Sequence, residues 1–435
     1  MNKYTINILF FLPTFALLTG CYRQAQHSYP PFNYVLGTQT FAPKYQFTDD
    51  TRLVETAKQI KAMGSNTIKL LVGSGAINDY KLPPNPEINS FTSLLDKEPS
   101  YRQVLRMPFD YYLFWVHSSP IENSKWGGYY GWSQGYSEQE RYDEYQQIYD
   151  LTCYLLTEFN NTGKTFMLGN WEGDWLLMEE PYRPDKQIAP AAISGMIQRM
   201  NNRQLAVDNA RKDTIYHNVA VYHYVEVRLV HRSRTEELEK FVDRNKVEIL
   251  MDDYKSGLKS ITTDVLPYTN VDYVSYSSYD SLFRYQNLPL SERKEKVARY
   301  LTDGLDWIDS HLPPKDNISG KRVFIGEYGF PVNKDHLTPQ AQDELSRVVM
   351  KTALQWGCPF ALYWQMYENE SEEGGSNASG YWLIDPDGNQ QPVYHTLKDF
   401  YSRACDYVKH YRQIMHRNPS QEQFRMEAVK WLDEK

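Results

Sequence analysis

Two glutamates follow short apolar segments at well-separated places in this chain. Glu172 comes three residues after the segment 165–169, and Glu327 comes directly after the segment 323–326. Short apolar segments bounded by glycine and polar residues predict buried strands. Two carboxyl groups at the ends of such strands can serve as an acid and a nucleophile, the pair that retaining hydrolysis of a glycosidic bond requires. The sequence therefore points first to chemistry by paired carboxylates.

Strand alternation predicts how these carboxylates are oriented. Side chains two residues apart share one face of a strand. We therefore expect Glu172 on the face of Phe166 and Leu168, and Glu327 on the face of Ile325. In α/β enzymes the strands fill the core and their carboxyl ends open onto the site. Both glutamates are thus predicted at the site end of an apolar face.

The elements that must position this pair alternate regularly along the chain. Segments rich in apolar and aromatic residues are separated by seven segments with helical periodicity, and a closing helix follows the last. This alternation predicts a parallel sheet, and the number of segments favours a (β/α)8 TIM barrel over a doubly wound sheet. We expect a single catalytic domain over residues 34–410. The predicted strands are 34–40, 66–72, 109–116, 164–172, 218–227, 271–280, 323–327 and 359–367.

Helix signals support this alternation. Thr51 predicts the cap of a first helix that ends at Gly64, and Ser137 with Glu140 forms a capping-box pattern. We expect one helix over about 91–105, and a further one over 235–244. The charged residues 411–435 are predicted to form a helical tail outside the main core.

The N-terminus has the pattern of an export signal. A short basic start precedes an apolar segment too short to span a bilayer, and Cys21 follows in Leu-Thr-Gly-Cys. This ending resembles a bacterial lipobox, so we expect residues 1–21 to be a lipoprotein signal peptide, Cys21 to be lipidated, and 22–33 to be a spacer. An ordinary signal peptide with a chance cysteine is the alternative. The expected location is the cell envelope, at the outer membrane, on a face that the sequence leaves open.

Composition narrows the partners. The net charge of -8 makes nucleic acid an unsuitable partner, because phosphate binding needs a basic surface. Aromatic residues make up 14% of the chain, which suits stacking on sugars, although large domains also use them for packing. The aromatic, glycine-rich segment 126–136 is predicted as a sugar-stacking wall, with a self-packed surface loop as the alternative.

Other chemistries find little support. The ten histidines form no His-x-His or His-Glu-x-x-His pair, so no metal or cofactor is expected. Removing Cys21 leaves Cys153, Cys358 and Cys405, an odd number in an exported chain. We expect these to be buried free thiols without a disulfide framework.

Several of these segments resemble the clan A glycoside hydrolases, retaining enzymes on (β/α)8 barrels. The likeness covers about 34–403 and rests on Gly-Glu-Tyr-Gly around Glu327, on Tyr-Trp ending at Trp364, and on residues 380–388. In that group the acid/base ends strand four and the nucleophile ends strand seven, which implies those roles for Glu172 and Glu327. The group usually has asparagine directly before the acid/base, whereas Trp171 intervenes here. No single family within the group is assigned.

Four further residues are expected to bind substrate. Asn170 and Glu226 are predicted to contact sugar hydroxyls, although Glu226 could equally form a salt bridge. Trp364 is expected as the floor of a sugar subsite. Tyr276 is predicted to donate to Glu327, with Tyr273 and Tyr279 as alternatives if the strand register differs.

Three hypotheses follow. The first is a retaining glycosidase acting on an extracytoplasmic poly- or oligosaccharide, with Glu327 as nucleophile and Glu172 as acid/base. The second is a non-catalytic glycan-binding lipoprotein on the same scaffold. The third is a barrel hydrolase with other chemistry, for which Asp174 or Asp280 would matter more. The paired glutamates favour the first, and the sugar, the linkage, endo or exo action and the oligomeric state stay open.

Overall fold

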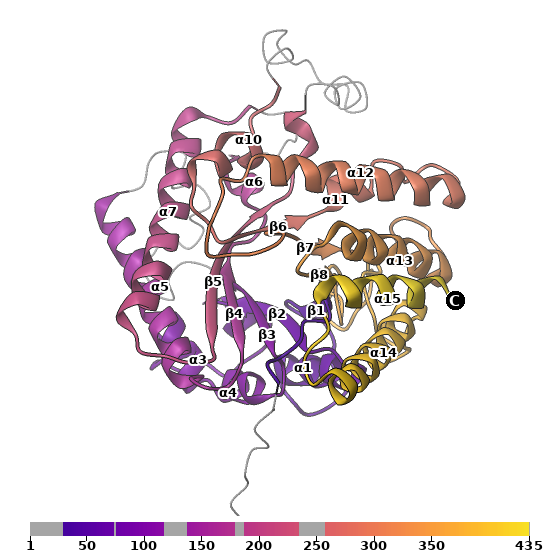
Figure 1. The fold of residues 1–435 in the computed structure, drawn as a ribbon, viewed down its shortest axis with the longest axis horizontal. Coiled ribbons are helices and arrows are strands. Elements are labelled where there is room, and N and C mark those ends of the chain that lie inside the picture. Colours follow the sequence, from indigo (N-terminus) through magenta and orange to yellow (C-terminus); the bar gives the residue numbers. More distant parts are fainter. Residues whose placement is uncertain (1–28, 74, 117–136, 179–186, 235–256, 435) are drawn as a thin grey trace, which may run out of the picture. The chain divides into compact units, whose positions relative to one another are not determined.

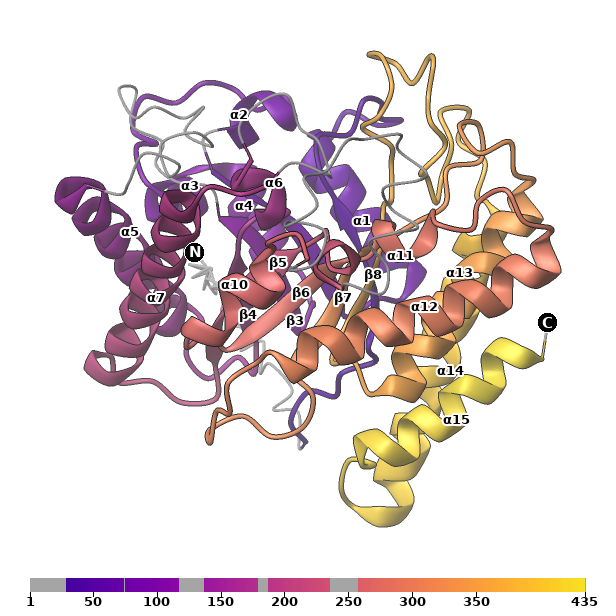
Figure 2. The ribbon, with the colours of Figure 1, turned by 90° about the horizontal axis from the view of Figure 1, so that it is seen from above.

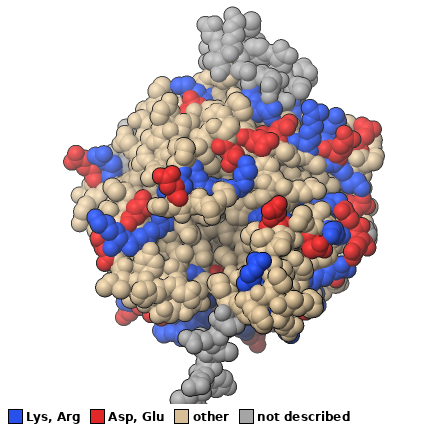
Figure 3. All heavy atoms as spheres, viewed as in Figure 1, with Lys and Arg blue, Asp and Glu red and all other residues tan. Residues whose placement is uncertain are grey.

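The computed structural model describes residues 29–73, 75–116, 137–178, 187–234 and 257–434. The chain divides into two compact units, Met1–Pro30 and Pro31–Lys435. All described helices and strands belong to the second unit. On the face shown in Figure 3, positively and negatively charged side chains are interspersed over this unit.

Eight parallel strands form a closed barrel, in which each strand pairs with its neighbours in sequence and β8 pairs with β1 (Figure 1). The predicted (β/α)8 TIM-barrel fold, with a single barrel domain, is therefore confirmed. The strands are shorter than the segments that predicted them, because the ends of those segments form the connecting turns. They are β1 Leu36–Thr40, β2 Thr67–Val72, β3 Tyr111–Val116, β4 Thr165–Gly169, β5 Ala220–Val227, β6 Tyr273–Ser277, β7 Val323–Tyr328 and β8 Ala361–Tyr363.

Helices surround the barrel, as the view from above shows (Figure 2). The principal ones are α1 Arg52–Met63, α3 Phe91–Lys97, α4 Pro99–Arg106, α5 Glu138–Glu158, α7 Pro190–Asp213, α12 Leu290–Ser310, α13 Pro339–Trp356, α14 Pro392–Met415 and α15 Gln421–Asp433. Short helices lie in the connections: α2 Gly75–Asp79, α6 Gly173–Leu176, α10 Ile261–Asp264, α11 Tyr279–Leu282 and the two 3-10 turns His231–Ser233 and Leu266–Tyr268.

Most helix boundaries follow from their caps. The Thr51 side chain caps α1, Gly64 ends it with φ 108°, and the Ser137 capping box starts α5. The single helix expected over 91–105 is instead two helices, α3 and α4. Glu98 caps α4 and Pro99 takes its first position, because proline lacks the N–H that a continuing helix would need.

The C-terminal segment is part of the packed structure, so its predicted place outside the main core is wrong. The boundary expected at residue 410 falls inside α14, and α15 packs against α13 and α14. Phe424, Ala428 and Leu432 on α15 are buried, and the Phe424 ring contacts Phe32 and Phe400. An amphipathic pattern diluted by charges hid this apolar stripe in the sequence.

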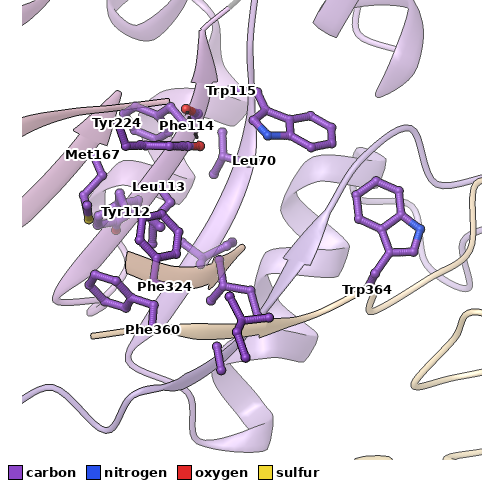
Figure 4. Packing of buried hydrophobic residues seen from close by; sticks show 14 of the residues in the cluster. Leu70, Tyr112, Leu113, Phe114, Trp115, Met167, Tyr224, Phe324, Phe360 and Trp364 are labelled. Carbon is purple, nitrogen blue, oxygen red and sulfur yellow. Dashed lines mark hydrogen bonds between the residues drawn. The ribbon is translucent and has the colours of Figure 1, made fainter. Parts of the chain in front are cut away.

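The expected strand faces are also wrong, for a reason that bears on the site. The Phe166 ring contacts Phe159, which follows α5, so that face of β4 packs against the helices. The interior face of β4 carries Gly169, where a Cβ atom would lie 2.1 Å from the Tyr224 ring. Figure 4 shows how closely such interior side chains pack, Tyr224 and Phe324 among them. Glu172 therefore faces the interior because of the turn after β4, and not because it continues the alternation of side chains along the strand.

On β7 a change of register has the same effect. The pairing with β6 shifts between Tyr276 and Ser277, which takes Ile325 opposite Tyr276 and Glu327 opposite Ser277. A Cβ atom on Gly326 would meet the Ser275 hydroxyl, so Gly326 faces the interior. The irregularity lets Glu327 face inward directly after it, as a β-bulge does.

Candidate active site

A cavity of about 540 Å³ lies at the carboxyl ends of the strands, and both predicted catalytic glutamates line it. Glu172 comes from the turn between β4 and α6, and Glu327 from β7. Glu172 is 6% exposed and Glu327 is 2% exposed, so both carboxyl groups lie in a nearly dry environment. The structure thus brings the two glutamates together in one site.

Eight of the seventeen residues that line the cavity are aromatic. Trp364 contributes, as predicted, and its ring stacks on that of Phe41 with centroids 5.5 Å apart. A cis peptide bond joins Trp364 to Gln365. Tryptophan and phenylalanine rings match the apolar faces of sugars, and tyrosine hydroxyls match their polar rims. The other aromatic residues of the wall are Trp115, Trp171, Trp175, Tyr279, Phe283 and Tyr381.

The Glu172 carboxylate forms an ion pair with Arg228 and accepts hydrogen bonds from two other side chains. Arg228 Nε lies 3.0 Å from one oxygen, Ser277 Oγ donates to the other at 2.5 Å, and Trp175 also donates. Burial raises the pKa of Glu172, while Arg228 and then Ser277 oppose that rise. These partners offset part of the cost of burying a charge on Glu172.

Arg228 was not among the residues predicted from the sequence. Its guanidinium lies 5.3 Å from the ring centres of both Trp175 and Tyr279, and it lines the cavity. Arginine stacks well on aromatic faces while its nitrogens pair with a carboxylate. The sequence feature that could have identified Arg228 is its position directly after the fifth predicted strand, at the same end of the barrel as both glutamates.

Glu327 has a different environment. Its Oε1 atom accepts no hydrogen bond within the described residues, and the nearest cation is Lys69 Nζ at 3.6 Å. Burial raises the pKa of Glu327 well above the usual value, Glu226 adds to the rise, and Lys69 opposes it. The Oε1 atom is itself buried, with the Lys69 cation beside it.

Glu226 lies beneath this pair and forms the salt bridge that was the alternative to a sugar contact, with Lys69 as its partner. The side chain is fully buried and does not line the cavity. Its oxygens accept hydrogen bonds from Lys69, Trp115 and Ser275 side chains and from the backbone N–H of Glu172. A carboxylate with about four acceptor positions is saturated by these donors.

Lys69 is the second site residue that sequence analysis missed. It is fully buried on β2, with Nζ 2.8 Å from a Glu226 oxygen and 4.4 Å from the centre of the Trp115 ring. The signal was present, because Lys69 is the one charged residue in the apolar segment 67–72. A lysine inside a strand that is buried on both faces requires a carboxylate partner.

Two other predicted site residues have hydrogen-bond partners within the protein. Asn170 turns its side chain to the backbone, since its amide donates to the Trp171 carbonyl and its oxygen accepts from the Glu226 N–H. Tyr276 points away from Glu327 and hydrogen bonds with Asp280 and Ser281. Because β6 places Ser275 and Ser277 inward, Tyr276 between them faces the helices.

The register alternative Tyr279 lies at the cavity instead. Tyr279 is the first residue of α11, after the end of β6, and its side chain lines the cavity. Burial raises the pKa of Tyr279 well above the usual value, and the charge of Glu327 adds to that rise. Of the three tyrosines considered from the sequence, Tyr279 is therefore the one whose pKa the Glu327 charge affects.

The carboxylates of the third hypothesis have structural roles. Asp174 is fully buried and accepts from the backbone N–H groups of Arg228, Leu229 and Ile261, so it fastens two loops. Asp280 accepts from the Tyr276 hydroxyl and from the His231 N–H. Burial raises the pKa of Asp280 to about 6. Neither lines the cavity.

Further expectations concern the thiols, metal ions and segments outside the described residues. Cys153, Cys358 and Cys405 are free, as predicted, but only Cys358 is buried and Cys405 is exposed. Within the described ranges no group of three potential ligands could hold a metal ion, and no helix is long and apolar enough to cross a membrane. The signal peptide with Cys21, the segment 126–136 and the helix expected over 235–244 lie outside the described residues.

Comparisons with known proteins support the fold. No family model and no curated protein matches the sequence. A GH5_18 protein from Streptomyces cattleya, solved with Manb1-4GlcNAc, superimposes with a TM-score of 0.51 and 10% identity over 85% of this chain and 80% of that one. The exo-beta-1,4-mannosidase of Opitutaceae bacterium strain TAV5 gives 0.52 and 11% over 87% of this chain and 60% of that one. The chain thus has the barrel fold found in the clan A glycoside hydrolases.

Proposed function

We propose that this protein is a retaining glycoside hydrolase, with Glu327 as nucleophile and Glu172 as acid/base. The observation that carries the proposal is that two buried glutamates, from the ends of β4 and β7, line one aromatic cavity. The similarity to solved barrel proteins supports the scaffold, and the proposal rests on the site itself. The substrate is a poly- or oligosaccharide whose sugar faces the Trp364 ring.

The reaction proceeds by double displacement. The Glu327 carboxylate attacks the anomeric carbon, the bond to the leaving oxygen breaks, and Glu172 gives its proton to that oxygen. The Glu172 carboxylate then takes a proton from water as the water oxygen attacks the anomeric carbon. The ester bond to Glu327 breaks, which returns both carboxyl groups to their starting states with the anomeric configuration retained.

The charges of the site suit this cycle. Lys69 and Arg228 bring two positive charges, and Glu172, Glu226 and Glu327 bring three carboxyl groups. One proton shared among the three carboxyl groups makes the buried assembly neutral, which burial favours. Double displacement also requires one protonated carboxyl beside one ionised nucleophile.

A second candidate is a non-catalytic glycan-binding protein. The observation that favours it is that burial raises the pKa of Glu327 well above the usual value and Glu226 adds to the rise. Burial also raises the pKa of Glu172, against the effect of Arg228 and Ser277. A nucleophile must be ionised, so substrate binding must favour the charged form of Glu327 if the first proposal holds.

Activated aryl glycosides of several sugars test the proposal on wild type and three variants. We expect wild type to act on one sugar, Glu327→Ala to be inactive, and azide to restore Glu172→Ala with a glycosyl azide of retained configuration. The exposed Glu292 on α12 supplies a control, because Glu292→Ala leaves the cavity unchanged. Full activity of Glu327→Ala would overturn the nucleophile assignment. Binding of oligosaccharides by calorimetry without turnover of any substrate would favour the second candidate.

We also propose that the protein is exported and held at the cell envelope by a lipid on Cys21. The support is the sequence pattern before Cys21 alone. A glycan outside the cytoplasm is then the substrate, and the barrel is carried at the membrane surface by its anchor.

A further inference from the structure

Glu226 makes more contacts with the catalytic pair than its position beneath the cavity suggests. Its side chain is fully buried, and its donors come from four different barrel strands or strand ends. One oxygen accepts from Trp115 Nε1 at 3.2 Å and from the Glu172 backbone N–H at 3.2 Å. The other accepts from Lys69 Nζ at 2.8 Å and from Ser275 Oγ at 2.6 Å.

These contacts join Glu226 to both catalytic residues by separate routes. The Glu172 N–H bond fixes the turn after β4 from which the Glu172 side chain extends. The Lys69 ammonium lies 2.8 Å from Glu226 and 3.6 Å from Glu327, so it is placed between two carboxylates. Lys69 also donates to the Gly326 carbonyl at 3.2 Å, so Glu226 and the β7 backbone together hold its charge at this distance from Glu327.

We propose that Glu226 is a positioning residue for the hydrolysis, which fixes the turn of Glu172 and holds the Lys69 cation at its distance from Glu327. This inference rests on the proposed function. Its electrostatic part, the effect of Glu226 on the charge of Glu327, can be measured without a substrate. Glu226 itself touches no substrate, because it lies below the cavity wall.

The sign of the electrostatic effect follows from the groups around Glu327. Glu226 disfavours the charged form of Glu327, and Lys69 favours it. In Glu226→Gln the negative charge disappears, and Lys69 loses its 2.8 Å partner and turns toward Glu327. Both changes lower the pKa of Glu327. Several charged and titratable groups face Glu327. They are Lys69 of β2, Glu172 after β4, Tyr224 and Glu226 of β5, Arg228 after β5, and Tyr279 of α11.

A titration that needs no substrate tests this. Protein labelled with carbon-13 at the glutamate carboxyl is followed by NMR over pH, and the Glu327 resonance is assigned from its loss in Glu327→Gln. We expect Glu226→Gln to lower the pKa of Glu327 by about 1–3 units. Adding Lys69→Met to Glu226→Gln removes the cation as well, so the pKa of Glu327 should rise again above that of the single variant.

A matched substitution separates this from a general effect of removing a buried ion pair. Glu144 on α5 pairs with Arg199 at 2.7 Å and is as buried as the site carboxylates, but it lies outside the cavity. Glu144→Gln should therefore lower the melting temperature and leave the pKa of Glu327 unchanged. An unchanged or raised pKa of Glu327 in Glu226→Gln, or an equal shift in Glu144→Gln, overturns the proposal.

Kinetic measurements then distinguish failure of the proposed function from failure of the role proposed for Glu226. With an active substrate, Glu226→Gln should move the acidic limb of kcat/KM to lower pH, because Glu327 must be ionised to attack. If no substrate is turned over, the proposed function fails while the titration still reports on Glu226. A purely structural role would reduce kcat without moving either the limb or the titration.

Discussion

The pairing of Arg228 with Glu172 leads to a prediction about pH dependence. Arg228 stabilises the ionised form of Glu172 and thereby lowers the pKa of this carboxyl against the effect of burial. General acid catalysis requires protonated Glu172, which exists only below its pKa. Replacing Arg228 by methionine, which keeps an apolar stem for the Trp175 and Tyr279 rings, should raise the pKa of Glu172. The basic limb of the pH profile should therefore move to higher pH.

The structure sets the size of this shift. At the 3.0 Å between Arg228 Nε and the Glu172 carboxylate, Coulomb's law gives about 5.5 kcal/mol at an effective dielectric constant of about 20. Water removed from both groups and the remaining donors, Ser277 and Trp175, offset part of this. An opposite charge this close typically shifts a carboxyl pKa by about 1–3 units, equivalent to ~1.4–4 kcal/mol. We expect a shift of the basic limb in that range.

The assay is kcat/KM against pH on the activated substrate that wild type turns over. Arg228→Lys is the matched control, because it keeps the positive charge and should hold the limb within a small fraction of the methionine shift. A basic limb that stays in place in Arg228→Met would refute the reasoning, since Glu172 would then not be the acid whose ionisation ends activity. So would movement of the acidic limb alone.

Two further predictions concern the ends of the chain. Phe424→Ala should destabilise the protein by about 3–5 kcal/mol, because the Phe424 ring is fully buried and its removal leaves a cavity in a packed core. Thermal unfolding measures this effect. Met426→Ala is the control, because Met426 is 58% exposed and this variant should unfold like wild type. Cys21→Ser should release the protein from the membrane fraction of a bacterial host, as detergent partition would show, and retention of the serine variant with the membrane would refute lipidation at Cys21.

The fold could be predicted because its signals are local and repeated. Eight apolar segments alternate with helical ones, and the caps Thr51 and Ser137 begin helices where expected. The errors arose where local signals conflict or are weak. Pro99 begins a new helix inside a continuous apolar pattern, and the buried stripe of α15 is diluted by charges.

The site was predictable in its two glutamates and in Trp364, and less so in what surrounds them. Residue type and place at a strand end identified Glu172 and Glu327. Their supporting contacts run between β2, β5 and β6, and no local pattern specifies which side chains meet across a barrel. Tyr276 shows the limit, because a change of one residue in register takes a side chain from the interior to the helices.

Lys69 and Arg228 are further examples of this limit, because their importance comes from contacts across the barrel and not from their positions in the sequence. Three buried carboxyl groups lie within one assembly, and only these two cations contact them closely among the described residues. Each cation contacts a different one of the two proposed catalytic glutamates, so each affects the pKa of a different carboxyl. Under the proposed mechanism Glu172 sets the basic limb of the pH profile and Glu327 sets the acidic limb. Arg228→Met and Glu226→Gln should therefore move opposite limbs of the profile.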